Sequence, residues 1–387
     1  MPRFVETQKA VDNALDRIDA LESGRQKGAL ARTGITEQRG PFLSSKQAIA
    51  PYFEREGKSY DYNPTNVRIG NLLAGVAFGE AYRKELNDDE QKSLLTLTGP
   101  GGDFTVPEGV QGPLIDAVRA KTRVIQAGAV TLPMLSQIVR IPGWVSPGIQ
   151  SGWAGEFVAL PDGGGQFRAI NLVSRAVGCV VSLSTELIED ASPGLGGLEG
   201  RVTNEISRAN AQAIDRAALI GAGTQDEPMG LYPRPSGRPD IAVQSLGVNG
   251  AIPTNYDFLI QLIGSLRAAN FDPNAIIYAP RTGQELGTLK DTQTRYLDPP
   301  AYLDDVTRLE TGQIPVNFTK GTSNVSSIAV AGQWDQCVIG FRPEMAFRMI
   351  RDPYSRAAQR VVNLVCWQRV DIGYFNTAAF AVADGID

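Results

Sequence analysis

The sequence predicts an α+β protein, and three features indicate it. Apolar residues recur three or four apart over 198–220, which is typical of a long one-sided helix. Strand-like segments over 140–175 flank the turn sequence Asp-Gly-Gly-Gly, as in a long two-stranded hairpin. After residue 225 helical and strand-like segments alternate. No repeat of about 20 to 50 residues is found, so a solenoid or propeller is not expected.

The composition excludes several kinds of chemistry. The 387 residues include no histidine, so neither a Ser-His-Asp triad nor an imidazole-dependent metal site can form. The chain has a formal net charge of −5, whereas nucleic-acid-binding proteins are usually basic. Uncharged stretches such as 124–139 are too short for a membrane-spanning helix. We therefore expect no histidine-dependent catalysis, no metal site that needs imidazole and no membrane-spanning helix.

The three cysteines, Cys179, Cys337 and Cys366, are far apart in the sequence and none belongs to a C-x-x-C pair. This spacing fits neither a zinc ribbon nor a disulfide framework. We interpret all three as small buried hydrophobic residues.

The first 98 residues are predicted to be largely helical. Apolar positions over 4–21 favour an amphipathic helix, with a short coiled coil as the alternative. A basic connector follows at 24–46, and a second helical stretch covers 66–95. The sequence Gly-Pro-Gly-Gly at 99–102 then breaks the chain.

The remaining elements are expected in a definite order. The long helix should end at Gly221-Ala222-Gly223. Helices are predicted at 108–120, 256–270 and 281–290, and strands at 104–107, 124–132, 176–183, 275–278, 316–318, 327–331, 338–339, 345–350, 361–370 and 377–383.

Short motifs punctuate this order over roughly residues 100–387. They are Gly101–Pro107, Trp153-x-x-Glu156, Val181–Asp190, Asp215–Gly223, Glu227–Gly230, Leu289–Asp291, Arg295–Leu297, Gly312–Val316, Gly332–Asp335 and Arg369–Gly373. Together they resemble the major capsid proteins of tailed bacteriophages, which share the Hong Kong 97-type capsid fold.

The resemblance implies a division into parts. Residues 1–98 would be a helical N-terminal extension, which we expect to be retained and packed against the shell, with a cleavable scaffold-like region as the alternative. The other parts implied are an N-terminal arm and the start of a peripheral domain (99–139), an extended loop (140–175), the peripheral domain with its spine helix (176–223), an axial domain (224–335) and return strands of both domains (336–387).

The resemblance also implies a function without catalysis, so no catalytic residue, cofactor, metal site or membrane contact is expected. The chain would assemble in the host cytoplasm into hexamers and pentamers of an icosahedral head, as part of the virion. Its partners would be other copies of itself, a portal protein at one vertex, a decoration protein, and packaged double-stranded DNA contacted non-specifically.

Two sets of residues follow as candidates. Glycine-rich turns are candidate hinges because they leave the backbone free to reorient; these are Gly163, Gly164, Gly165, Gly194, Gly196 and Gly197. Aromatic and charged residues of the hairpin and of the arginine-rich C-terminal strands are candidate contacts between subunits; these are Trp153, Glu156, Phe167, Arg168, Arg342, Arg351 and Arg356.

Two other functions stay open at this point. An encapsulin-like nanocompartment shell would have a similar fold around a cargo enzyme. A histidine-free hydrolase could use paired carboxylates from Glu156, Glu186, Glu189 and Asp190. Without histidine, any maturation switch that acid triggers must act through carboxylates. Its midpoint should therefore lie at about pH 4 to 5.

One departure from the family yields a prediction. Some members cross-link covalently through a lysine of the extended loop, but this chain has no lysine between Lys121 and Lys290. We therefore expect shells held by noncovalent contacts or by a decoration protein. Particles boiled in detergent should release a monomer near 41.6 kDa on a denaturing gel. A persistent ladder of heavier bands would contradict the prediction.

Overall fold

The computed structural model describes residues 43, 87–88, 91, 104–105, 108–144, 152–154, 167–184, 186–187, 196–233, 238–351 and 361–387. The expected helix at 4–21, almost all of the basic connector and most of the helical stretch at 66–95 lie outside these residues.

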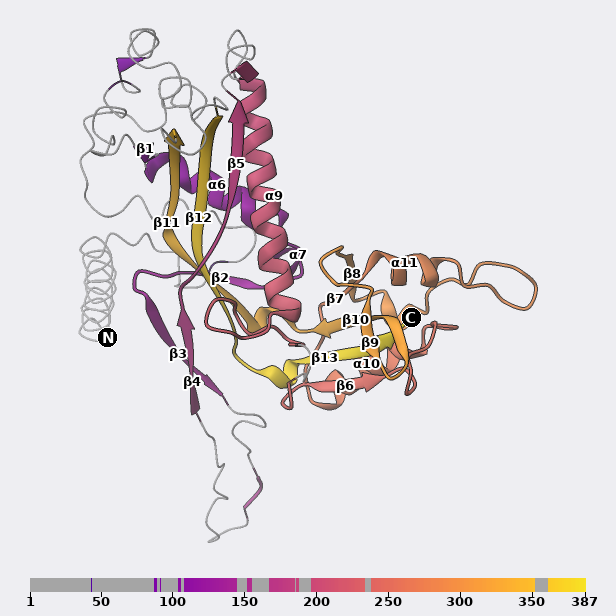
Figure 1. Cartoon of the computed structure of the whole chain (residues 1–387). Helices are drawn as coiled ribbons and strands as arrows, with labels where there is room; N and C mark the ends of the chain where they lie inside the picture. The colour runs from indigo at the N-terminus through magenta and orange to yellow at the C-terminus, as the bar shows by residue number, and fades with distance from the viewer. Residues whose placement is uncertain are drawn as a thin grey trace, which may run out of the picture. The chain divides into compact units, whose positions relative to one another are not determined.

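The described strands form two mixed sheets and a separate hairpin (Figure 1). The long sheet has the order β1 (Phe104–Thr105), β11 (Cys337–Arg351), β12 (Val361–Tyr374) and β5 (Arg175–Ser184), with β2 (Val130–Pro133) parallel to β11. The compact sheet has the order β6 (Ala242–Ser245), β13 (Phe380–Ile386), β10 (Ser323–Gly332), β7 (Ala275–Tyr278) and β8 (Thr307–Glu310), with β9 (Phe318–Lys320) on β10. The hairpin pairs β3 (Ile138–Trp144) with β4 (Phe167–Val173).

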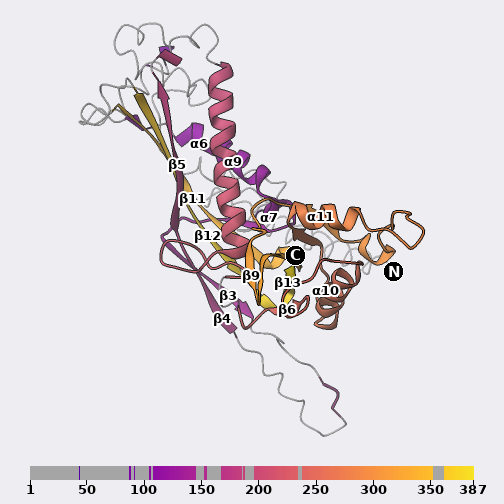
Figure 2. The same ribbon diagram turned by 45° about the vertical axis from the view of Figure 1, so that its right-hand side comes forward.

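The long sheet is covered on one face by helix α9 (Gly196–Ile220), which runs alongside β5 and β12 in both views (Figure 2). Its 25 residues span about 37 Å. Helix α6 (Glu108–Lys121) packs against α9. The sequence expectation of a long helix is confirmed, although α9 begins two residues earlier, so Gly196 and Gly197 belong to its first turn.

Burial alternates along β12, and every second side chain points to the face of the sheet beneath α9. Val362, Leu364 and Cys366 of β12 are buried, while the residues between them are only half-buried. On α9 the buried stripe includes Ile206 and Ile214. Apolar residues every second position on the strand and every third or fourth on the helix therefore meet in one layer.

The end of α9 depends on two glycines. A Cβ on Gly221 would collide with the carbonyl oxygens of Pro228 and Ala217, and a Cβ on Gly230 would collide with the backbone nitrogen of Gly221. The returning loop is bridged antiparallel to the helix end by Ala222 and Met229. The Gly-Ala-Gly and Glu-Pro-Met-Gly motifs thus allow a close backbone approach.

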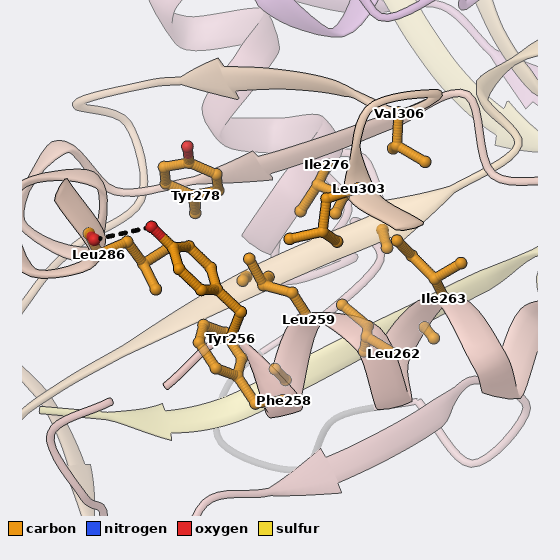
Figure 3. Close-up of a cluster of buried hydrophobic side chains, with 14 of the residues drawn as sticks. Tyr256, Phe258, Leu259, Leu262, Ile263, Ile276, Tyr278, Leu286, Leu303 and Val306 are labelled. Atoms are coloured by element: carbon orange, nitrogen blue, oxygen red, sulfur yellow. Dashed lines mark hydrogen bonds between the residues drawn. The ribbon is translucent and has the colours of Figure 1, made fainter. Parts of the chain in front are cut away.

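The compact sheet has its own core, built largely by helix α10 (Asp257–Ala268) (Figure 3). Leu259, Leu262 and Ile263 of the helix are less than 2% exposed and lie in one buried cluster with side chains of β7, β10 and β13. The Tyr256 hydroxyl donates to the Leu286 carbonyl at 3.0 Å, which fixes helix α11 (Pro280–Gly287). The short helix η3 (Ala301–Leu303) contributes Leu303 to this core.

The two sheets are joined where β10 passes into β11 and β12 passes into β13. The short helices η4 (Trp334–Gln336) and η6 (Thr377–Ala379) form these connections. Trp334 is fully buried there, and its indole N–H donates to the Ala275 carbonyl at 3.0 Å. Phe380 lies edge-on to Trp334 at 5.4 Å and to Tyr374 at 5.5 Å. We call these three rings the crossing cluster.

One expected strand is wrong in its first half. Residues 124–132 read as one apolar strand, but α7 (Arg123–Gln126) is helical and only β2 is extended. The backbone N–H groups of Arg123 and Val124 donate to the Asp215 carboxylate of α9 at 2.9 and 3.0 Å. This long-range cap stabilises a helical turn that local sequence does not favour.

Other boundaries also differ from expectation. The two short runs at 338–339 and 345–350 are one strand, β11, interrupted by an irregularity between Phe341 and Met345. The tail begins as η6 before it becomes β13, and β9 starts only at Phe318. The strands β6 and β8 were not expected, because each has four residues and a mostly exposed pattern.

The crossing cluster should make a large contribution to stability. Replacing Trp334 by Phe removes the donor to Ala275 and leaves a small void, so the free energy of unfolding should fall by about 2 kcal/mol or more. Chemical denaturation of the unassembled chain measures this. The control is Trp153→Phe, because Trp153 is 104% exposed, and it should leave that free energy unchanged. Equal effects of the two substitutions would contradict the prediction.

Asp215 should make stability depend on pH. Burial raises the pKa of its carboxyl from 3.8 to about 6, against the two N–H groups and Arg123, which lower it. The folded chain therefore holds this proton more tightly than the unfolded chain, and the stabilisation is lost as pH rises towards 6. Asp215 therefore titrates at a higher pH than the range of about 4 to 5 expected from the sequence for ordinary carboxylates.

We expect the unfolding free energy to lose up to about 3 kcal/mol between about pH 4 and pH 6.5 from this one group. The variant Asp215→Asn does not titrate, so the component should disappear from its stability profile. The control Asp226→Asn, at an exposed aspartate, should keep it. The same pH profile in Asp215→Asn and wild type would overturn this assignment.

Candidate assembly surfaces

The β3–β4 hairpin is anchored at its base. Its strands pair from Ile138 with Val173 to Trp144 with Phe167. The buried residues at the base are Ile141, Ile170 and Leu172 of the hairpin with Leu132, Met134 and Val338. Cβ atoms on Gly340 or Gly373 would collide with these side chains, so glycine makes room for the base. Beyond it an isolated two-stranded hairpin is only marginally stable and benefits from another surface.

A buried carboxylate fixes the turn from β4 into β5. Asp371 of β12 is 2% exposed, accepts from the backbone N–H of Val173 at 2.6 Å and pairs with Arg175. Burial raises the pKa of Asp371, although the Val173 N–H and the Arg175 charge oppose this. Arg175 also donates to the Gln225 carbonyl at 3.1 Å. The hairpin is thereby held to the long sheet and to the loop after α9.

The described candidate contact residues lie on β4, in the segment between the hairpin strands and on β11. Phe167 and Arg168 lie on β4, opposite Trp144 and Gly143. Trp153 is fully exposed in the segment between the hairpin strands. Arg342 is half-buried on β11, and Arg351 ends the same strand. The structure therefore does not gather them into one cluster. Glu156, Arg356, Gly163, Gly164, Gly165 and Gly194 lie outside the described residues.

Residues 289–297 form a turn, which contains the two sequence motifs Leu289–Asp291 and Arg295–Leu297. Leu297 N–H donates to the Leu289 carbonyl at 2.9 Å, and Asp291 N–H donates to the Arg295 carbonyl at 2.9 Å. The Lys290 ammonium lies 4.8 Å from the centre of the Tyr296 ring. The turn is therefore ordered by its own residues while Tyr296 stays 67% exposed.

Large apolar side chains are exposed around both sheets, and among them the sequence analysis had named Trp153 as a candidate contact. A partner chain that covers such side chains removes their apolar surface from water. Near the hairpin and the long sheet they are Leu135, Ile138, Trp153, Val180 and Leu187. Around the compact sheet they are Val243, Val248, Ile252, Tyr296, Leu297, Tyr302, Val316 and Val325.

The described residues offer no site for a metal ion. No group of three or more Cys, Asp or Glu side chains there is arranged to hold a metal ion. Of the paired carboxylates considered for a hydrolase, only Glu186 is described, and it is exposed. No helix in the described ranges has the length and apolarity needed to cross a membrane.

Comparison with known proteins identifies the family of this chain. Residues 102–385 match the model of the phage capsid family. The major capsid protein of Klebsiella oxytoca phage phiKO2 is 24% identical over 235 residues, which are 60% of this chain and 53% of that protein. The chain therefore aligns with about half the length of this relative.

Solved structures show the same fold. The capsid of an empty GTA particle has a TM-score of 0.52 at 20% identity, covering 69% of this chain and 90% of that one. A chain of Mycobacterium phage Ogopogo has a TM-score of 0.51 at 16% identity, covering 68% and 92%. Because the family match spans most of the chain, this protein belongs to the phage capsid family, has the Hong Kong 97-type fold, and is structural rather than enzymatic.

Proposed function

We propose that this phage major capsid protein assembles into hexamers and pentamers of an icosahedral head that encloses packaged double-stranded DNA. The observation that carries the proposal is the hairpin, which is anchored at its base and bears the fully exposed Trp153 beyond it. Exposed apolar residues around both sheets add to this. Neighbouring subunits that cover such surface lower the free energy of the assembly.

The parts of the chain then acquire roles. Residues 99–139 and 176–223 form the arm and the peripheral domain, with α9 as its spine helix. Residues 140–175 are the extended loop, and 224–335 form the axial domain. Residues 336–387 serve both domains, because β11 and β12 lie in the long sheet while β13 lies in the compact sheet. Residues 1–98 are a retained extension.

Contacts between subunits would come from the hairpin and from the arginine-rich strands. The hairpin supplies Trp153, Glu156, Phe167 and Arg168, which suit a neighbour's apolar or acidic surface. Arg342 and Arg351 of β11 would form ion pairs, and so would Arg356 further along the chain. The glycines at 163–165 and 194–197 would let the hairpin and α9 change inclination in an expanding precursor. A portal protein, a decoration protein and non-specifically bound DNA complete the virion, which is assembled in the host cytoplasm.

Electron microscopy and size-exclusion chromatography of the expressed full-length chain test the proposal. We expect rings or closed shells, whereas a chain that stays monomeric at every concentration would overturn it. The absorbance ratio of particles from infected cells separates a DNA-filled head from a nanocompartment shell, which would contain protein cargo. Intact mass of the subunit from those particles tests whether residues 1–98 are retained.

The hairpin contact can be tested with one substitution. Trp153→Ala should leave the folding of the single chain unchanged, because the side chain is fully exposed. A buried tryptophan at an interface is commonly a hot spot, so the concentration needed for assembly should rise at least about tenfold. Light scattering measures this threshold, and Asp226→Asn is the matched surface control. An unchanged threshold in Trp153→Ala would exclude Trp153 from the contact.

A further inference from the structure

Two cysteines that are remote in sequence lie opposite each other in the long sheet. Cys179 of β5 is the register partner of Cys366 of β12, between the pairs Val180 with Val365 and Gly178 with Trp367. Residues directly opposite in an antiparallel pair have Cα atoms about 4.5 or 5.5 Å apart. Both separations fall within the range of about 4.4 to 6.8 Å that disulfides span.

The two thiols also share a face. Side chains directly opposite in an antiparallel pair point to the same side of the sheet. Cys366 is 1% exposed, and the Asn210 amide of α9 lies 4.0 Å from its sulfur, so this face is the one covered by α9. Cys179 is half-buried in the same layer. A small reagent therefore reaches Cys179 first.

The strands approach closely beside this pair. A Cβ on Gly178 would collide with the Cys366 carbonyl oxygen and with Trp367, so this position of β5 accommodates only glycine without a shift. Three residues along, the Ser182 hydroxyl donates to the Asn363 side chain at 2.8 Å. The backbone around the cysteines is thus held in close register from both sides.

We propose that Cys179 and Cys366 form an oxidisable cross-strand disulfide site, reduced in the structure and closed by a peroxide. The Cys179 thiolate attacks one peroxide oxygen, the O–O bond breaks, and a sulfenic acid and water result. The Cys366 thiolate then attacks the sulfenic sulfur and expels a second water as the S–S bond forms. Two thiols lose two protons and two electrons, and hydrogen peroxide becomes two waters.

The local environment sets the rate of this reaction. Burial raises the pKa of Cys366 to about 12 and also raises the pKa of Cys179. Only a small thiolate fraction exists at neutral pH, so closure is slow and accelerates as pH rises. The bond stays open in a reducing cell and closes over time in an oxidising medium. The disulfide would link β5 covalently to β12. This inference does not depend on the proposed assembly.

Thiol counting on the full-length protein tests the site. The reduced chain is treated with hydrogen peroxide at several pH values, alkylated in denaturant without reductant, and weighed by mass spectrometry. We expect the number of alkylated cysteines to fall from three to one, faster at higher pH, with a linked pair of peptides spanning Cys179 and Cys366. Dithiothreitol should restore all three, and the closed form should unfold at a higher temperature.

Single variants assign the bond. Cys337→Ala should fall from two alkylated cysteines to none, because Cys337 lies on β11 and takes no part. Cys179→Ala and Cys366→Ala should each keep two, and neither should gain thermal stability on treatment. The proposal is overturned if all three thiols stay free, if Cys179 is over-oxidised while Cys366 remains free, or if Cys179 links two chains instead.

Discussion

The rest of the structure depends on the packing of the crossing cluster, where the chain passes between its two sheets. Trp334, Phe380 and Tyr374 stand edge to face, and each end of the cluster is hydrogen-bonded to a different core. The indole N–H of Trp334 donates to β7 of the compact sheet. The Tyr374 hydroxyl donates to the Ala218 carbonyl of α9 at 2.6 Å. The three buried rings therefore connect the core of the compact sheet to the core beneath α9. Their packing and hydrogen bonds restrict how the two sheets can be oriented relative to each other.

This constraint explains the glycine in the motif that precedes Trp334. A Cβ on Gly332 would overlap the Phe380 ring, so only glycine lets β10 run beside that ring. The same principle recurs at Gly221, Gly230 and Gly373, where backbone or side chains occupy the space of a Cβ. Several family motifs are thus places of close approach rather than places of chemistry. A protein that functions through shape needs such contacts more than it needs a nucleophile or a metal.

The hairpin illustrates how local stability relates to function. Its base is secured by a small apolar cluster and by Asp371, which is buried with Arg175 as partner. A buried ion pair of this kind adds orientation more than stability, because desolvation offsets much of the attraction. The direction of the hairpin is consequently set at the base, while Trp153 remains fully exposed. Such a part is suited to bind a neighbouring subunit without refolding.

The sequence by itself determined the elements with strong periodicity. The long helix, the hairpin and the strand at 275–278 were predicted closely, because apolar spacing reflects which face of each element is buried. Tertiary structure alone decided the features that join distant residues. Asp215 caps α7 from across 91 residues, and the first part of an expected strand is therefore helical. Register alone placed Cys179 opposite Cys366, and three-dimensional packing alone left Trp153 exposed while burying Trp334. Periodicity encodes burial along one element, whereas pairing partners and caps depend on residues that no local pattern connects.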